Sequence, residues 1–253
     1  MRVQILAALA CAVVGTAGSS RAAEAKRPRE IIDQAIIEAG GSEALARYKQ
    51  PFRQKFKTID PSGKASVRDG RITILLPDKL REENTATIRG QAVALGSVFN
   101  SKQGFERGDG GPPGRLQIQQ RTMGPAEIKG HRNRLYAQWV ATLLPLDDAA
   151  FEFGGIEEIG LDERAAFGVR VSRAKRPDVR LYFDKETMML VKLSWRPNET
   201  VEAAQVFDDF AELDGLAYPR KITFFLNGKP VNERHVTEFE FLDKVEDGTF
   251  EKF

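Results

Sequence analysis

Hydrophobic and polar positions alternate along residues 179–195, VRLYFDKETMMLVKLSW. Successive side chains of a strand point to opposite faces, so this pattern predicts two antiparallel strands joined by a turn at Asp184–Thr187. The apolar side chains fall on odd positions and share one expected face: Val179, Leu181, Phe183, Met189, Val191, Leu193 and Trp195. We expect this face to point into the protein, toward either a packed core or a bound molecule.

Similar short runs, bounded by Gly, Pro, Asp or Asn, continue from Phe52 to Phe241 and predict about ten antiparallel strands. The Gly- and Pro-rich segment 104–114 is expected to be a loop. Asp214–Gly215 and Asn227–Gly228 are typical two-residue hairpin turns. In the last hairpin, the alternation assigns these side chains to one face: Ile222, Phe224, Leu226, Val231, His235, Thr237, Phe239 and Phe241.

Helical spacing of apolar residues appears in two regions. Pro28 opens PREIIDQAIIEAGG, Gly40–Gly41 end it, and Ser42 caps a second short helix, EALARYK. A longer helix is expected after Gly124–Pro125, in AEIKGHRNRLYAQWVATLL, and ends at Pro145. One side of this helix carries Ile128, His131, Leu135, Trp139 and Leu143.

A sheet of so many strands is too wide to stay flat and is expected to curl around its apolar face. The predicted fold is α+β and mainly antiparallel β: a curved open half-barrel with an N-terminal helix pair and an inserted lid helix on the concave side. Neither a linker nor a repeat of fixed period interrupts the pattern. We therefore predict a single domain over residues 26–253.

Residues 1–25 differ in composition from the rest of the chain. Arg2 precedes an apolar run over residues 5–14, and small residues follow at the spacing that signal peptidases accept. The run is too short to span a bilayer. We predict a signal peptide that is removed, which places the protein in a periplasm or outside the cell. Lipidation at Cys11, the only cysteine, is not expected because the apolar run continues past it.

The charge balance argues against some partners. Lys and Arg total 38 against 36 Asp and Glu, and the basic residues are scattered singly. Such a chain offers no strong positive patch for nucleic acid or for an acidic membrane. Hydrophobic residues make up 42% of the sequence, an ordinary supply for a core.

Catalytic motifs are absent: the sequence has no GxSxG elbow, HExxH helix, Walker loop or paired CxxC. His131 and His235 both lie on predicted apolar faces, where a hydrogen-bonded structural histidine is the more common role. Asp208 and Asp209 are adjacent on a predicted strand and point to opposite faces, so they cannot easily share a metal ion. We predict no enzymatic activity, no metal site and no cofactor.

Aromatic residues are frequent at positions expected to face the concave side. The residues predicted to line an apolar ligand cavity are Phe56, Ile74, Trp139, Phe183, Trp195, Phe224 and Phe239. A packed core would use the same residues. However, an empty cavity of ~300 Å³ would cost roughly 7 kcal/mol, comparable to the stability of a whole domain. The concave side is therefore expected to hold its own helices, water or a bound lipid.

Several segments resemble the LolA/LolB-like periplasmic lipoprotein carriers and lipoprotein-sorting proteins: LLPDKLREE (75–83), LLPLDDAAFEF (143–153), DVRLYFDKETMMLVKLSW (178–195) and FLDKVEDGTFEKF (241–253). The similarity of pattern extends over nearly all of residues 26–253. It implies a half-open barrel whose apolar concave face holds acyl chains without covalent chemistry. Such relatives usually have Gly where this chain has Met188, so a left-handed backbone there would be mildly strained.

Two functions are compatible with the sequence. The first is a periplasmic, non-enzymatic carrier for an apolar, acylated ligand, with a lipid or an acylated lipoprotein as partner and the middle helix as lid. The second is an envelope sensor that uses the same fold to bind a membrane protein and has a merely packed interior. A hollow inside the half-barrel distinguishes the first from the second.

Overall fold

The structure of this chain is a computed structural model that describes residues 27–61, 67–88, 91–109, 118–161 and 164–253. The predicted signal peptide, residues 1–25, and Cys11 lie outside these ranges. The described strands form one antiparallel sheet of thirteen, in the order β6-β5-β4-β3-β2-β1-β13-β12-β11-β10-β9-β8-β7. The division into a signal peptide and a single domain over residues 26–253 stays a prediction.

The strands follow one another along the chain as two meanders. The first meander comprises β1 (Phe52–Ile59), β2 (Arg68–Leu75), β3 (Lys79–Ile88), β4 (Gln91–Asn100), β5 (Gln103–Asp109) and β6 (Ile118–Thr122). The second comprises β7 (Phe151–Leu161), β8 (Arg164–Arg173), β9 (Val179–Asp184), β10 (Leu190–Trp195), β11 (Ala203–Leu213), β12 (Leu216–Leu226) and β13 (Lys229–Phe241). Pairing of β1 with β13 joins the two meanders in the middle of the sheet.

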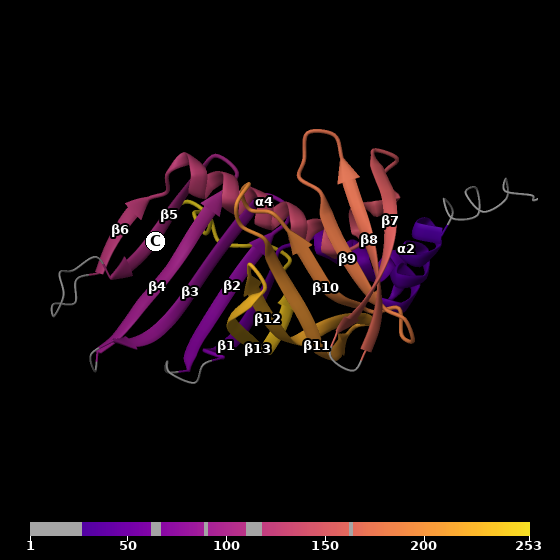
Figure 1. Cartoon of the computed structure of the whole chain (residues 1–253). Coiled ribbons are helices and arrows are strands. Elements are labelled where there is room, and N and C mark those ends of the chain that lie inside the picture. The colour runs from indigo at the N-terminus through magenta and orange to yellow at the C-terminus, as the bar shows by residue number, and fades with distance from the viewer. Residues whose placement is uncertain (1–26, 62–66, 89–90, 110–117, 162–163) are drawn as a thin grey trace, which may run out of the picture.

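Helices precede the first meander and connect it to the second. The helices α2 (Arg27–Glu38), α3 (Gly41–Leu45) and the 3₁₀ helix η1 (Ala46–Lys49) come before β1, and α4 (Pro125–Ala141) and the 3₁₀ helix η2 (Leu144–Asp147) lie between β6 and β7. Figure 1 shows α4 lying across the curved sheet, with β4–β6 at one end of the molecule and β7 and α2 at the other. The carboxylate of Glu127 fixes the start of α4 by accepting the backbone N–H of Gly124 at 2.8 Å.

This architecture confirms the predicted fold class, a curved and open antiparallel sheet with an N-terminal helix pair and an inserted helix. The sheet has more strands than the alternation predicted. The expectation of a loop over residues 104–114 was wrong for its first part, because β5 extends to Asp109. Packing favours glycine at position 104 of this strand, because a side chain there would collide with the sulfur of Met123.

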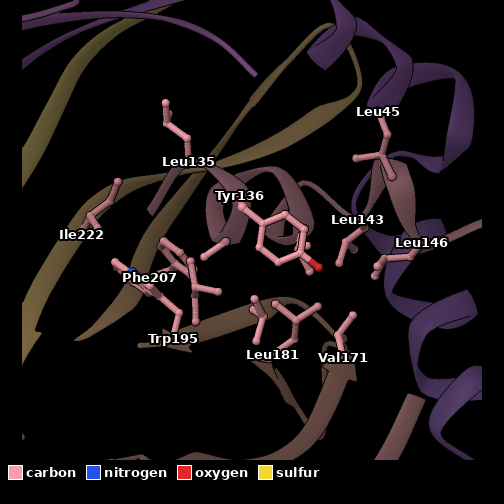
Figure 2. Close-up of a cluster of buried hydrophobic side chains, with 14 of the residues drawn as sticks. Leu45, Leu135, Tyr136, Leu143, Leu146, Val171, Leu181, Trp195, Phe207 and Ile222 are labelled. Carbon is pink, nitrogen blue, oxygen red and sulfur yellow. The ribbon is translucent and has the colours of Figure 1, made fainter. Parts of the chain in front are cut away.

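The main core lies between α4 and the concave face of the sheet. Leu135 of α4 and Val171, Leu181 and Leu193 of the strands are fully buried. Figure 2 shows Leu135 and Tyr136 projecting from α4, with Val171 and Leu181 on the strands opposite. Leu135 of the predicted stripe faces the sheet, but Tyr136, Ala137 and Val140 complete the buried face of α4, whereas His131 and Trp139 are only partly buried.

A β-bulge breaks the predicted alternation of the hairpin at 179–195. Lys192 pairs with Tyr182 and Leu190 pairs with Phe183, which leaves Val191 as an extra residue. Val191 packs against Tyr182 in a small cluster separate from the main core, so its assignment to the inner face was wrong. Met188, just before the bulge, has a φ of 56°, in the left-handed region that favours glycine.

Two further bulges change which side chains in the middle of β13 face the core. The register shifts at Val231 and at Thr237, which are extra residues relative to the neighbouring strands. Because side chains alternate with a period of two, one extra residue moves those that follow to the other face. Arg234 and Val236 are therefore buried, whereas His235 is half-exposed. The predicted inner face holds for Phe239 but was wrong for Val231, His235 and Thr237.

Candidate functional site

A mainly apolar cavity of about 150 Å³ lies on the concave side of the sheet. Leu45 and Tyr48, from the helices before β1, and Leu143, which follows α4, form its helical wall. Ile74 of β2 and Phe207 of β11 belong to the wall that the strands provide. The cavity thus lies where the helix pair, the end of α4 and the centre of the sheet meet.

The cavity is small for a lipid. Pockets that bind drug-sized ligands usually have ~300 to 1,000 Å³, and an engineered cavity of ~150 Å³ in another protein holds one benzene. A cavity of about 150 Å³ therefore takes a few methylene groups and not a whole acyl chain.

Polar side chains interrupt the apolar wall. Gln54, Gln138 and Gln205 all line the cavity. The amide oxygen of Gln138 is buried and has no hydrogen-bond partner among the residues that the structure describes. Because an unpaired buried acceptor is costly, this amide is a point at which a hydroxyl or amide group of a ligand can be bound.

A buried ionic cluster lies at one end of the cavity. Arg234 of β13 donates to Glu82 of β3 at 2.6 Å, and Arg134 of α4 donates to the other oxygen of the same carboxylate at 3.3 Å. The guanidinium carbon of Arg234 also lies 3.8 Å from the centroid of the Phe56 ring. Burial by itself raises the pKa of Glu82, but attraction by the two arginines outweighs it and lowers this pKa to about 2. The ionised carboxylate thus connects α4 to β3 and β13.

A second hollow, of about 390 Å³, lies on the other side of this cluster. Its wall includes His131 in the N-terminal half of α4 and Trp195 at the end of β10. Phe224 and Arg234 line both hollows, so these two side chains form the partition between them.

The structure places the seven predicted cavity residues in different settings. Ile74 and Phe224 line the apolar cavity, and Trp195 and Phe224 line the second hollow. Phe56 and Phe183 are buried in the main core, where Phe56 lies beneath Arg234 and Phe183 belongs to β9.

The remaining two residues pack against different aromatic neighbours. Phe239 packs against the rings of Tyr218 and Phe52, with centroids 4.8 and 5.6 Å away. Trp139 is half-buried on α4 and packs toward β7, 6.0 Å from the ring of Phe151. Contact of any of the seven residues with a ligand stays a prediction.

Sequence reasoning missed the charged members of the site, Arg234, Glu82 and Arg134. Arg234 stands in NERHVTE and Glu82 in KLREEN, segments in which charged residues dominate and resemble a solvent-exposed face. The only signal for Arg234 is the register of β13, which the sequence alternation does not reveal because the strand contains two bulges.

The two histidines occupy different environments. His131 lies over Phe99, with ring centroids 5.7 Å apart and ring planes inclined by 20°. Burial, helped by Arg134, lowers the pKa of His131 to about 4, so this histidine is neutral at pH 7. His235 is half-exposed and pairs with the carboxylate of Glu233.

Asp208 and Asp209 have separate partners. Asp208 accepts a hydrogen bond from Arg164 at 2.6 Å, and Asp209 accepts one from Arg220 at the same distance. Within the described ranges, no group of three or more His, Cys, Asp or Glu side chains is placed to hold a metal ion. None of the helices in the described part of the chain has the length and apolar character needed to cross a membrane.

Comparison with known proteins bears on the fold. No family model matches the sequence, and no curated protein matches it. The structure is similar to that of an outer membrane lipoprotein-sorting protein domain from Vibrio parahaemolyticus, with a TM-score of 0.50 and 9% identity over 90% of this chain and 97% of that chain. It is also similar to a LolA superfamily protein from Nitrosomonas europaea, with a TM-score of 0.50 and 11% identity over 89% and 97% of the two chains. The chain therefore has a LolA-like fold, as its segments suggested.

Proposed function

We propose that this protein is a non-enzymatic carrier, in a periplasm or outside the cell, that binds an apolar, acylated ligand on the concave side of its sheet. The ligand is a lipid or the acyl chains of a lipoprotein, and residues 1–25 act as the signal peptide that directs the chain there. The observation that carries the proposal is the apolar cavity of about 150 Å³ between the helices and the sheet. The likeness in fold to a lipoprotein-sorting protein domain supports it.

In this proposal the helices serve as a lid. Ala141 and Leu143 near the end of α4, with Leu45 and Tyr48 before β1, cover the cavity. A whole acyl chain needs more room, so these segments move away from the sheet as the ligand enters. Burial of each methylene group contributes ~0.8 kcal/mol to the binding free energy, so an acyl chain of about twelve methylene groups contributes on the order of 10 kcal/mol. This gain offsets the contacts that the lid loses.

The predicted lining residues take different parts in binding. Ile74 and Phe224 already face the cavity and make the first contacts with the chain. Phe56 and Phe239 become accessible as the lid moves, because they lie on the neighbouring strands β1 and β13. Trp195 contacts the part of the ligand in the second hollow. Phe183 and Trp139 support the wall and hold α4.

Native mass spectrometry of the mature protein, purified without detergent, tests the proposal. We expect bound lipid before solvent extraction, none after it, and rebinding when phospholipid or a diacylated lipopeptide is added. Ala141→Leu fills the cavity from α4 and is expected to lower lipid retention by about fivefold or more, since it removes ~1 kcal/mol or more of contact with the ligand.

The matched control is Ala126→Leu, which adds the same atoms to an exposed position in the first turn of the same helix. This variant is expected to retain lipid like the parent protein. A parent protein that carries no lipid after purification and takes up none afterwards contradicts the carrier function.

The small volume of the cavity favours one alternative, the envelope sensor with a packed interior. In that case the concave side is core, and the protein acts by binding a membrane protein. A pull-down from solubilised envelope that recovers one membrane protein equally well with lipid-loaded and lipid-extracted protein supports the sensor. Loss of recovery on extraction supports the carrier.

A further inference from the structure

The second hollow, of about 390 Å³, has polar groups on its wall that the binding of an acyl chain does not use. Three buried atoms there have no hydrogen-bond partner within the part of the chain that the structure describes: Nε1 of Trp195, Nε of Arg234 and Nδ1 of His131. An indole N–H and a guanidinium N–H can only donate. Trp195 and Arg234 are each only 6% exposed, so solvent has little access to these donors.

The unpaired donor of Arg234 is held in place by the rest of the side chain. Nη2 of Arg234 donates a hydrogen bond to Glu82 at 2.6 Å, and the guanidinium carbon lies 3.8 and 5.2 Å from the ring centroids of Phe56 and Phe224. Unpaired buried donors are rare in native proteins because they are costly. Two of them on one hollow indicate that acceptor atoms of a ligand belong there.

The charges around the hollow decide what kind of acceptor fits. Arg234 and Arg134 share the carboxylate of Glu82. Glu106 and Glu127, which also line the hollow, both pair with Arg121. These three arginines and three glutamates balance, and burial lowers the pKa of His131, which also lines the hollow, so that it adds no charge at pH 7. A balanced site favours a neutral acceptor, such as an ester or amide carbonyl, over a free anion.

The position of the hollow connects it to both the cavity and the surface. Phe224 and Arg234 are shared with the apolar cavity, so a molecule that fills both hollows passes these side chains. At the outer end, Leu226 and Val231 on the β12–β13 hairpin line the hollow and are 44% and 42% exposed. An amphiphile can therefore meet an apolar lip, then donors, and then the apolar interior.

We propose that the second hollow binds the ester or amide linkage of an acylated ligand, with the N–H groups of Trp195 and Arg234 donating to its carbonyl oxygens. This inference rests on the carrier function proposed above. The acyl chain continues past Phe224 into the apolar cavity, and the polar remainder of the ligand extends beyond Leu226 and Val231 into solvent. The site thereby selects acyl esters and amides among apolar molecules.

Binding of two matched probes to the mature, lipid-extracted protein tests the inference: dipalmitoylglycerol, which has ester carbonyls, and the dihexadecyl ether of glycerol, which lacks them. Isothermal titration or native mass spectrometry with competing probes gives the affinity ratio. We expect the ester to bind at least about tenfold more tightly, the combined effect of a neutral hydrogen bond from Trp195 and a charge-assisted hydrogen bond from Arg234. Equal affinities for ester and ether overturn the inference and leave the carrier function intact. No binding of either probe contradicts the carrier function itself.

A variant assigns the preference to the hollow. Trp195→Phe keeps an aromatic ring and removes one of the two donors, so the preference for the ester is expected to fall about threefold to fivefold, the effect of one neutral hydrogen bond, while the affinity for the ether changes little. Tyr182→Phe is the matched control because it likewise keeps an aromatic ring and removes a donor, but in the small cluster around Val191, which lines neither hollow. It is expected to keep the parent preference. A Trp195→Phe protein that still prefers the ester as strongly as the parent overturns the assignment.

Two natural sources share this linkage, a phospholipid and a lipoprotein. Phosphatidylglycerol and a synthetic diacylated cysteine peptide with equal chains separate them in the same competition. Tighter binding of either, with the preference reduced by Trp195→Phe, supports the inference and identifies the source. If both probes bind tightly and Trp195→Phe does not weaken the binding of either, the result counts against the inference.

Discussion

The two sides of the concave surface differ in how they are filled. Over β8–β10, Val171, Leu181 and Leu193 are fully buried, and α4 packs directly on β9 and β10. Over β1, β12 and β13, the surface borders both hollows and holds the ionic cluster of Arg234 and Glu82. The side over β8–β10 therefore holds α4 through apolar packing. The side over β1, β12 and β13 is packed less densely around its polar groups, and this open space is what a binding site requires.

The largest expected effect is on the packed side. Phe183→Ala removes a fully buried ring and is expected to lower the free energy of unfolding by ~4 to 5 kcal/mol, the upper range for such a change. Phe224→Ala, on the hollow side, is expected to cost only ~1 to 2 kcal/mol because its ring is half-exposed, but to abolish most lipid retention. Urea unfolding and native mass spectrometry measure the two effects. Equal stability losses would erase the difference between the sides.

The next effect concerns the ionic cluster. Glu82→Gln leaves two arginines without a counter-charge, and we expect a loss of ~3 to 4 kcal/mol in urea unfolding at pH 7. Glu83→Gln is the control on the same strand: Glu83 pairs with Arg71 and Arg81 nearer the surface, and its loss is expected to cost less than ~1 kcal/mol. Similar costs for both variants would show that the cluster is not buried.

The same carboxylate predicts a dependence on pH. The pKa of Glu82 is lowered from 4.5 to about 2 in the folded protein, so its contribution is complete above about pH 5 and is lost as the pH falls through 4.5 toward 2. At about 1.4 kcal/mol per pKa unit, a shift of this size corresponds to at most about 3 to 4 kcal/mol. The stability difference between the parent and Glu82→Gln is expected to shrink over this range. A constant difference from pH 6 to pH 2.5 contradicts the prediction.

The smallest effect is expected at the outer lip of the second hollow. The double variant Leu226→Ser, Val231→Ser changes exposed side chains, so unfolding free energy is expected to change by less than ~0.5 kcal/mol. Lipid affinity is expected to fall about twofold to threefold, because little apolar area is involved. Ile37→Ser, at an exposed apolar position on α2, serves as the control. A similar loss of affinity in that control would remove any special role of the lip.

The sequence predicts well what depends on local periodicity. The helix pair, α4 and the hairpin at 179–195 follow from spacings of apolar residues, and the fold class follows from their order. The burial of Arg234 could not be predicted, since bulges at Val231 and Thr237 interrupt the period of two. The volume of the cavity was also beyond reach, because it depends on how the helices pack against strands distant in sequence.

The pairing of β1 with β13 has a consequence for how the chain reaches its native state. Within each meander, every strand pairs with a neighbour in sequence, whereas Phe52 pairs with Phe241 across most of the chain. Loop closure disfavours such distant pairing, so the two meanders form first and their junction forms last. A nascent chain that ends before Lys229 leaves β1 and β12 as open edges in the middle of the sheet. Until its final strand is made, the protein is exposed to edge-to-edge aggregation.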